Sequence, residues 1–106
     1  MNEKEKLIYE AKAKVLKALA HPTRLWMTEQ LASGEKCVCI FAKAIDADFS
    51  TISKHLRVLK EAGIVESEKR GKQVHYRLKV PCMLNFMSCV EAVIETNIKQ
   101  QTALLK

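Results

Sequence analysis

Four cysteines are the residues of this sequence best suited to chemistry, and two of them stand close together. Cys37 and Cys39 are separated by one residue, whereas Cys82 and Cys89 lie in the last third of the chain. The first residues mix charges and no apolar stretch follows them, so we expect no export signal and a cytoplasmic location. Thiols in that reducing compartment serve as ligands, as switches or as buried apolar groups rather than as disulfides.

The stretch from Glu35 to Cys39 is rich in thiols and predicts a brief extended segment before a helix. In an extended chain, residues two apart share a side and lie ~7 Å apart, whereas on a helix they diverge. The prediction therefore allows both thiols to hold one ion. Trivalent arsenic or antimony prefers three sulfur ligands, and cadmium, lead or zinc takes three or four.

Cys82 and Cys89 are the other thiols that could complete such a site, within one subunit or across a dimer. Cys82 follows Pro81 and is expected near the start of the last helix, whose positive end favours a thiolate. The two are seven residues apart, so both fit one side of that helix, although Cys89 is equally well explained as a buried apolar residue. The histidines stand far apart and predict no histidine-type zinc or nickel site (His21, His55 and His75).

The 106 residues suit one domain, residues 1–106, and the apolar content of 48% suffices for a modest core. The longest apolar run has six residues, far short of the ~20 that a membrane helix needs. The segment from Thr51 to Lys79 contains eight basic and three acidic residues, so it carries +5 of the net charge of +6. Such a concentrated positive field favours a polyanionic partner.

Apolar periodicity and turn residues predict a mainly α-helical chain with a small β-hairpin. The expected elements are helices over about 4–20, from Pro22 to Ser33, over 40–45 and from the N-cap Asp48 to Ala62, strands over 64–68 and 73–78, and a last helix after Pro81. Two helices joined by a short turn and followed by a hairpin make a winged helix-turn-helix, with the hairpin as the wing.

On a helical wheel, the helix that follows Asp48 turns Ile52, Leu56 and Leu59 toward the core. Its other side carries hydroxyls and cations that suit a DNA major groove, and the wing tip suits the DNA backbone. The predicted DNA-binding residues are Ser50, Thr51, Ser53, Lys54, His55 and Arg57, together with Arg70, Lys72 and Gln73 on the wing.

The first and last helices carry apolar faces with no partner in this set of elements, centred on Ile8, Val15, Leu19 and on Met87, Val90, Ile94. A two-fold dimer that buries both faces is the simplest solution. Such a dimer would present two reading helices to a pseudo-palindromic operator in double-stranded DNA.

Four stretches of the chain resemble the ArsR/SmtB family of small bacterial and archaeal metal-responsive repressors. They are residues 16–25 (LKALAHPTRL), 37–39 (CVC), 50–65 (STISKHLRVLKEAGIV) and 70–78 (RGKQVHYRL). The resemblance implies a homodimeric repressor that holds its operator without a cofactor and releases it when an inducer binds. The arsenic- and cadmium-sensing members of this family carry the Cys-Val-Cys motif, which implies a soft metal or metalloid bound at Cys37 and Cys39.

Three function classes follow from these residues. The first is a repressor induced by a soft ion, foremost trivalent arsenic or antimony, with cadmium, lead or zinc less favoured. The second is a repressor on the same fold that responds to thiol oxidation or persulfide. The third, a thiol enzyme, is not expected, because no cysteine and histidine stand at a spacing typical of a nucleophile and its base.

Overall fold

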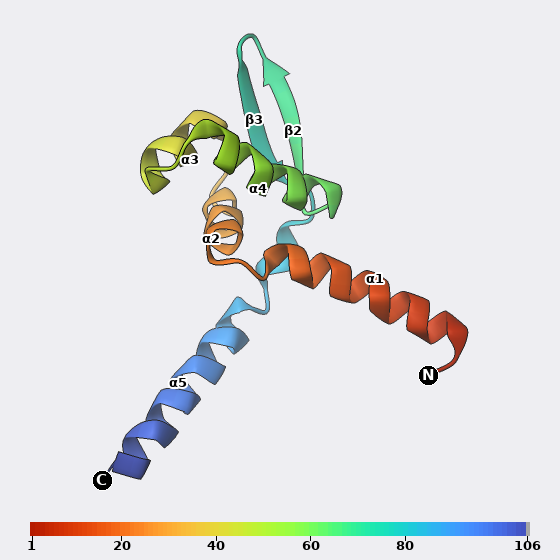
Figure 1. Ribbon diagram of the computed structural model, residues 1–106, viewed down its shortest axis with the longest axis vertical. Helices are drawn as coiled ribbons and strands as arrows, with labels where there is room; N and C mark the ends of the chain where they lie inside the picture. Colours follow the sequence, from red (N-terminus) through yellow and green to blue (C-terminus); the bar gives the residue numbers. More distant parts are fainter. Residues whose placement is uncertain (106) are drawn as a thin grey trace.

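The computed structural model describes residues 1–105, which form helices and a small sheet whose hairpin projects from the helical body (Figure 1). The elements are α1 Glu3–Leu19, α2 Pro22–Leu31, β1 Lys36–Cys37, α3 Val38–Ile45, α4 Phe49–Glu61, β2 Val65–Arg70, β3 Gln73–Leu78, the 3-10 helix η1 Pro81–Leu84, and α5 Met87–Leu105. This order confirms the predicted winged helix-turn-helix, in which α3 and α4 form the helix-turn-helix and β2 and β3 form the wing. Over residues 1–105, no helix combines the length and the apolar content required to cross a bilayer.

Side chains just before α2 and α4 start these helices by accepting hydrogen bonds from backbone N–H groups. His21 Nδ1 accepts from the N–H of Thr23 at 3.1 Å, and Pro22 supplies the first residue of α2. Asp48 Oδ1 accepts from the N–H of Thr51 at 2.8 Å. The predicted N-cap of α4 is therefore confirmed, and the residues after it have fixed positions along the helix.

The helix α3 begins two residues earlier than predicted, because the thiol of Cys37 serves as its N-cap. Cys37 Sγ accepts a hydrogen bond from the backbone N–H of Cys39 at 3.3 Å. The prediction that residues 35–39 form one extended segment is therefore wrong: β1 covers only Lys36–Cys37, and Cys39 lies in the first turn of α3. The helix ends at Asp46, whose φ of 53° places it in the left-handed region that short polar residues tolerate.

The wing hairpin is part of a three-stranded antiparallel sheet with the order β1-β3-β2. Gly71, with φ +63°, occupies the turn between β2 and β3, where a glycine adopts the left-handed conformation without strain. In the β1–β3 pairing, Cys37 lies opposite His75. Residues 35–39, here called the cysteine segment, are therefore joined to the wing through one sheet, which the sequence did not predict.

The core lies beneath α4, and the three residues predicted to point inward are all fully buried (Ile52, Leu56 and Leu59). Helices α1, α2 and α3, the strand β2 and the residue before it supply the other residues of the core cluster: Ala18, Leu19, Met27, Leu31, Val38, Phe41, Ile64 and Val65. Because burial fixes the rotation of α4 about its own axis, its opposite face points into solvent.

The chain after the wing departs from the prediction of one continuous helix. Pro81 opens η1, in which Met83 N–H and Asn85 N–H bond to carbonyls three residues earlier, at 3.0 Å each. This tight helix ends before α5 begins at Met87. Cys82 and Cys89 therefore lie on different elements, and Cys82 is not at the positive end of the last helix.

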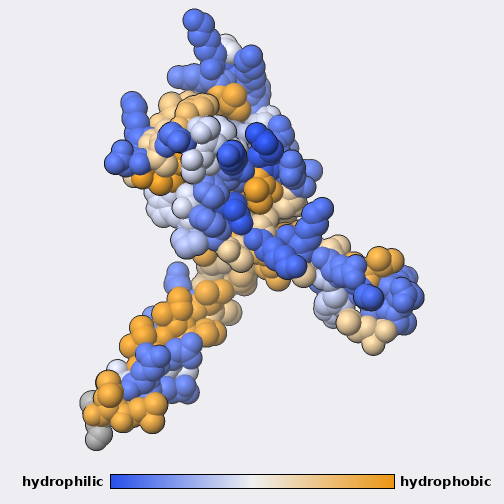
Figure 2. Space-filling view, in the orientation of Figure 1, coloured by the Kyte–Doolittle hydropathy of each residue, from blue (hydrophilic) through white to orange (hydrophobic). Residues whose placement is uncertain are grey.

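Both α1 and α5 extend away from the body of the molecule (Figure 1) and expose large apolar side chains. Hydrophobic residues run along α5 in Figure 2. The exposed residues are Leu7, Ile8, Tyr9 and Leu16 on α1, and Val90, Val93, Ile94, Ile98, Leu104 and Leu105 on α5. Leu19, predicted on this face, is instead only 4% exposed and belongs to the core. Apolar faces of this extent are typical of an interaction surface.

Candidate nucleic-acid interface

The outward side of α4 is polar and basic, as its sequence pattern predicts. Ser50, Thr51, Lys54 and Arg57 are exposed, and Ser53 is half-buried. Lys54 and Arg57 are three residues apart, which places them on neighbouring turns of one helix face. Two cations and several hydroxyls therefore project together from a helix whose other side is held in the core.

The carboxylate of Asp48 organises the start of this face. Besides capping Thr51, it accepts a hydrogen bond from the hydroxyl of Ser50 at 3.0 Å. Hydrogen bonds from Thr51 and Ser50, with a further contribution from the charge of Lys54, lower the pKa of Asp48. The cap therefore stays ionised at neutral pH and fixes the residues that begin α4.

His55, one of the predicted DNA-binding residues, lies at the junction of α4 with the first two helices. Its ring centroid is 4.5 Å from that of His21, and its Nδ1 is 3.4 Å from Nη1 of Arg24. Burial, and then the nearby charges of His21 and Arg24, lower the pKa of His55. The structure thus gives this half-buried residue a packing contact, whereas the other predicted residues of α4 keep their outward placement.

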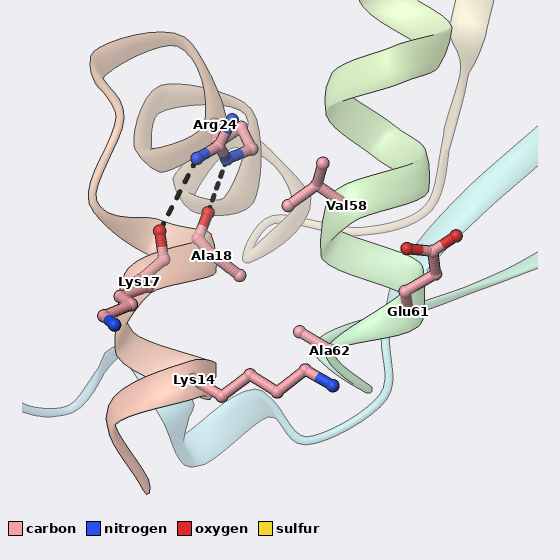
Figure 3. Close-up of a pocket in the computed structure, with 7 residues that line it drawn as sticks. All are labelled: Lys14, Lys17, Ala18, Arg24, Val58, Glu61 and Ala62. Atoms are coloured by element: carbon pink, nitrogen blue, oxygen red, sulfur yellow. Dashed lines mark hydrogen bonds between the residues drawn. The ribbon is translucent and has the colours of Figure 1, made fainter. Parts of the chain in front are cut away.

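Arg24 of α2 lines an open cleft of about 290 Å³ between α1 and α4 and bonds to the end of α1 (Figure 3). Its Nε donates to the carbonyl of Ala18 at 2.6 Å, and a second nitrogen lies 3.5 Å from the carbonyl of Lys17. The residue four positions after Ala18 is Pro22, which has no N–H, so the helix itself cannot satisfy that carbonyl. Arg24 fills this place and reaches His55 with its remaining nitrogen. Sequence reasoning gave Arg24 no role, although the proline offered a signal.

The three wing residues predicted to bind DNA differ in their surroundings. Lys72 and Gln73 are exposed at the hairpin turn. Arg70 forms ion pairs with Glu35 and, at 2.9 Å, with Glu68. The hydrogen bonds that Arg70 donates to Glu68 and then to Glu35 raise the pKa of Arg70. Arg70 therefore keeps its charge but is already paired with two carboxylates. The sequence did not predict the pair with Glu35.

The two thiols of the Cys-Val-Cys motif lie together even though the segment is not extended. Cys37 is 7% exposed and Cys39 is half-buried. A hydrogen bond to the Cys37 thiol, followed by burial, raises the pKa of Cys39, while the charge of Lys43 acts in the opposite direction. In the free protein this pair therefore favours the neutral thiol at Cys39.

Cys82 and Cys89 are exposed and do not join the Cys37–Cys39 pair within one subunit. Across residues 1–105, no group of three or more cysteine, histidine or acidic side chains is placed to hold a metal ion. Cys82 lies in an apolar cleft of about 470 Å³ with Leu16 of α1. A single subunit therefore offers two adjacent sulfur donors to a soft ion but no third one.

Comparison with known proteins places this arrangement among transcriptional regulators. A sequence model described as "Bacterial regulatory protein, arsR family" matches residues 21–67, which include the whole helix-turn-helix and the motif Cys37-Val38-Cys39. The chain is 45% identical over 65 residues to the arsenical resistance operon repressor of Escherichia coli (strain K12), covering 60% of this chain and 56% of that one. It is 46% identical over 67 residues to the cadmium resistance transcriptional regulatory protein CadC homolog of Staphylococcus aureus, covering 62% and 55%. The chain thus spans about half the length of the curated relatives that it matches.

The fold has a close counterpart in the solution structure of a homodimeric winged helix-turn-helix DNA-binding domain from Mycobacterium bovis, a possible ArsR-family regulator. The two superpose with a TM-score of 0.77 at 28% identity, over 94% of this chain and 93% of that one. The matched proteins are regulators, which confirms the expectation that this chain is not an enzyme. Sequence and fold agree, and the chain belongs to the ArsR family of bacterial regulatory proteins.

Proposed function

We propose that this protein is a DNA-binding transcriptional repressor that reads a major groove with α4. The rotation of α4 carries this proposal: because Ile52, Leu56 and Leu59 are fully buried, Lys54 and Arg57 face outward. Arginine pairs with guanine, and hydroxyls bond base edges or phosphates. The proposed contacts on this helix are Ser50, Thr51, Ser53, Lys54 and Arg57, with His55 acting mainly by holding the helix in place.

The wing supplies contacts to the DNA backbone in this proposal. Lys72 and Gln73 stand at the exposed turn, where they can reach a phosphate or the minor groove. Arg70 joins them when a phosphate replaces one of its carboxylate partners. Because phosphate contacts release counterions, this part of the affinity falls steeply with salt.

Two copies of the chain pair through the exposed apolar faces of α1 and α5. The similar domain from Mycobacterium bovis is homodimeric, and these faces are otherwise uncovered here. A two-fold dimer presents two α4 helices to successive major grooves of a pseudo-palindromic operator. As a repressor of transcription, the dimer would act in the cytoplasm, where its thiols stay reduced.

The proposed inducer is trivalent arsenic or antimony bound at Cys37 and Cys39. Two adjacent thiols suit this ion, and the relative from Escherichia coli is an arsenical resistance operon repressor. Each thiol replaces one hydroxide of As(OH)₃, and its proton leaves with that hydroxide as water, so no oxidant is needed. The third ligand is a retained hydroxide or a further thiol such as Cys82 or Cys89 across the dimer. Because Cys37 caps α3, its movement disturbs the helix that supports α4.

Two alternatives keep the same fold and the same cysteines. A cadmium, lead or zinc sensor is supported by the similarity to the CadC homolog, whose name records cadmium resistance. A redox or persulfide switch is supported by the hydrogen bond from the Cys39 N–H to the Cys37 thiol, which holds the two cysteines next to each other.

The deciding experiment measures release of DNA under each inducer. Purified protein, reduced and kept anaerobic, is bound to a fluorescent duplex enriched from a random pool by the protein itself, and anisotropy follows the complex. We expect release on adding arsenite. Release by cadmium alone, or only by a persulfide donor, selects the corresponding alternative. Failure to enrich any duplex contradicts the proposed repressor function.

A further inference from the structure

Glu35 links the cysteine segment to the wing, and the mechanism proposed so far gives it no role. It directly precedes β1, and Cys37 follows two residues later on the same side of the extended chain. Since Cys37 lies opposite His75, the same register places Glu35 opposite Arg77. The thiol that caps α3 and the Glu35 carboxylate therefore lie on one face of the wing sheet.

The Glu35 carboxylate contacts both strands of the wing. It forms an ion pair with Arg70, the last residue of β2, and the second hydrogen bond of this pair measures 3.1 Å. On β3, Nη1 of Arg77 and Nδ1 of His75 each lie 3.6 Å from a Glu35 oxygen. Because β3 is the central strand, the side chain of Arg70 crosses over it to meet Glu35.

The other carboxylates of this network belong to the hairpin itself. Glu66 accepts from Nε of Arg77 at 2.8 Å, and Glu68 accepts from Arg70 at 2.9 Å. Among the described residues, Glu35 is the acidic partner of these arginines that lies outside the hairpin. A displacement of the cysteine segment therefore reaches Arg70 through Glu35, whereas Glu66 and Glu68 move with the wing.

We propose, building on the arsenic-responsive repressor proposed above, that Glu35 is a positioning residue that transmits occupancy of the Cys37–Cys39 pair to the wing. When both sulfurs close on one ion, the backbone at Cys37 shifts, and Glu35, two residues earlier, shifts with it. The Glu35–Arg70 contact then changes, and the guanidinium leaves the position from which it reaches DNA. Ion binding thereby alters the wing as well as α3.

The test compares Glu35→Gln with the matched control Glu66→Gln. Each replaces one carboxylate of the same network by an amide of the same shape, but only Glu35 belongs to the cysteine segment. Operator affinity is measured by anisotropy without arsenite and with saturating arsenite, and free thiols are counted in both states. We expect both variants to bind DNA and arsenite. Arsenite lowers the operator affinity of the wild-type protein by a certain factor. In Glu35→Gln we expect this factor to be about two- to fivefold smaller, which corresponds to the contribution of one partly exposed ion pair. In Glu66→Gln the factor should equal that of the wild type.

An arsenite response of wild-type size in Glu35→Gln overturns this proposal, as does an equal reduction in Glu66→Gln. If Glu35→Gln fails to fold by circular dichroism, Arg70→Gln removes the other partner and must show the same reduced response. A wild-type protein that keeps its operator under both arsenite and cadmium is a different result. It refutes the proposed metal sensing itself, and the transmission through Glu35 with it.

Discussion

Replacing Arg24 by alanine should destabilise the fold by about 2 kcal/mol, because one hydrogen bond of this residue has no substitute. A hydrogen bond from a charged donor contributes roughly 1.5–3 kcal/mol. The bond from Arg24 Nε to the Ala18 carbonyl is short, at 2.6 Å, and Pro22 cannot replace it. The contacts to Lys17 and His55, at 3.5 and 3.4 Å, are long and add little.

The assay is urea unfolding followed by circular dichroism, at equal protein concentration because dimer formation couples to stability. With an m-value of about 1–2 kcal/mol/M, the loss moves the midpoint down by roughly 1–2 M urea. Arg24→Lys is the matched control: it keeps the charge and lacks the guanidinium geometry, so it should recover only part of the loss. A destabilisation below about 0.5 kcal/mol in Arg24→Ala, the usual size of a surface substitution, would refute the role assigned to this bond.

Three further outcomes follow from the same structure. Arg57→Ala should weaken binding to the selected duplex by about 1–3 kcal/mol and relax its sequence preference, as a comparison of selected and random duplexes by anisotropy will show. Cys37→Ser or Cys39→Ser should leave operator affinity unchanged and abolish release by arsenite in a titration of the preformed complex. The third concerns pH: His55 has a pKa below its ordinary value of 6.5, so the folded protein binds fewer protons there than the unfolded chain. The contribution of His55 to the free energy of unfolding is complete well above pH 6.5. It is lost as the pH falls through 6.5 and then through the lower pKa of the folded state. Urea unfolding at pH 7.5 and at pH 5.5 measures this loss.

Each of these outcomes has its own control. Lys69→Ala, an exposed change on the wing away from α4, should not alter the sequence preference that depends on Arg57. Cys89→Ser separates loss of the Cys37–Cys39 pair from a general loss of thiols, and normal arsenite release by Cys37→Ser would exclude that thiol as a ligand. His55→Gln should lessen the dependence of stability on pH, and an unchanged dependence would assign it to other groups.

Features that depend on residues close together in the chain were predictable from the sequence. The spacing of Ile52, Leu56 and Leu59 determined which side of α4 is buried, because a helix repeats every 3.6 residues. Asp48 was recognisable as an N-cap because a short carboxylate satisfies the free N–H groups of a helix start. The hairpin followed from alternation in β3 and the glycine in its turn.

The features that depend on contacts distant in sequence, or on an unusual local choice, were not predictable. A thiol is an uncommon N-cap, so nothing in the pattern showed that Cys37 would start α3 and draw Cys39 into a helix. The Arg70–Glu35 pair joins residues 35 positions apart, and its existence depends on β1 adding to the wing sheet. Arg24 matters because Pro22 has no N–H to donate to the Ala18 carbonyl, which accepts from Arg24 instead.

In the proposed mechanism, binding of the ion by Cys37 and Cys39 and release of DNA are one event. Arsenite is titrated into the anaerobic complex of wild-type protein and selected duplex, while anisotropy reports bound DNA and mass spectrometry after rapid alkylation identifies which cysteines remain free. We predict that protection of Cys37 and Cys39 and loss of the complex follow the same curve, with one arsenic bound per pair. DNA released while both thiols are still open to alkylation, or retained after both are protected, would contradict it.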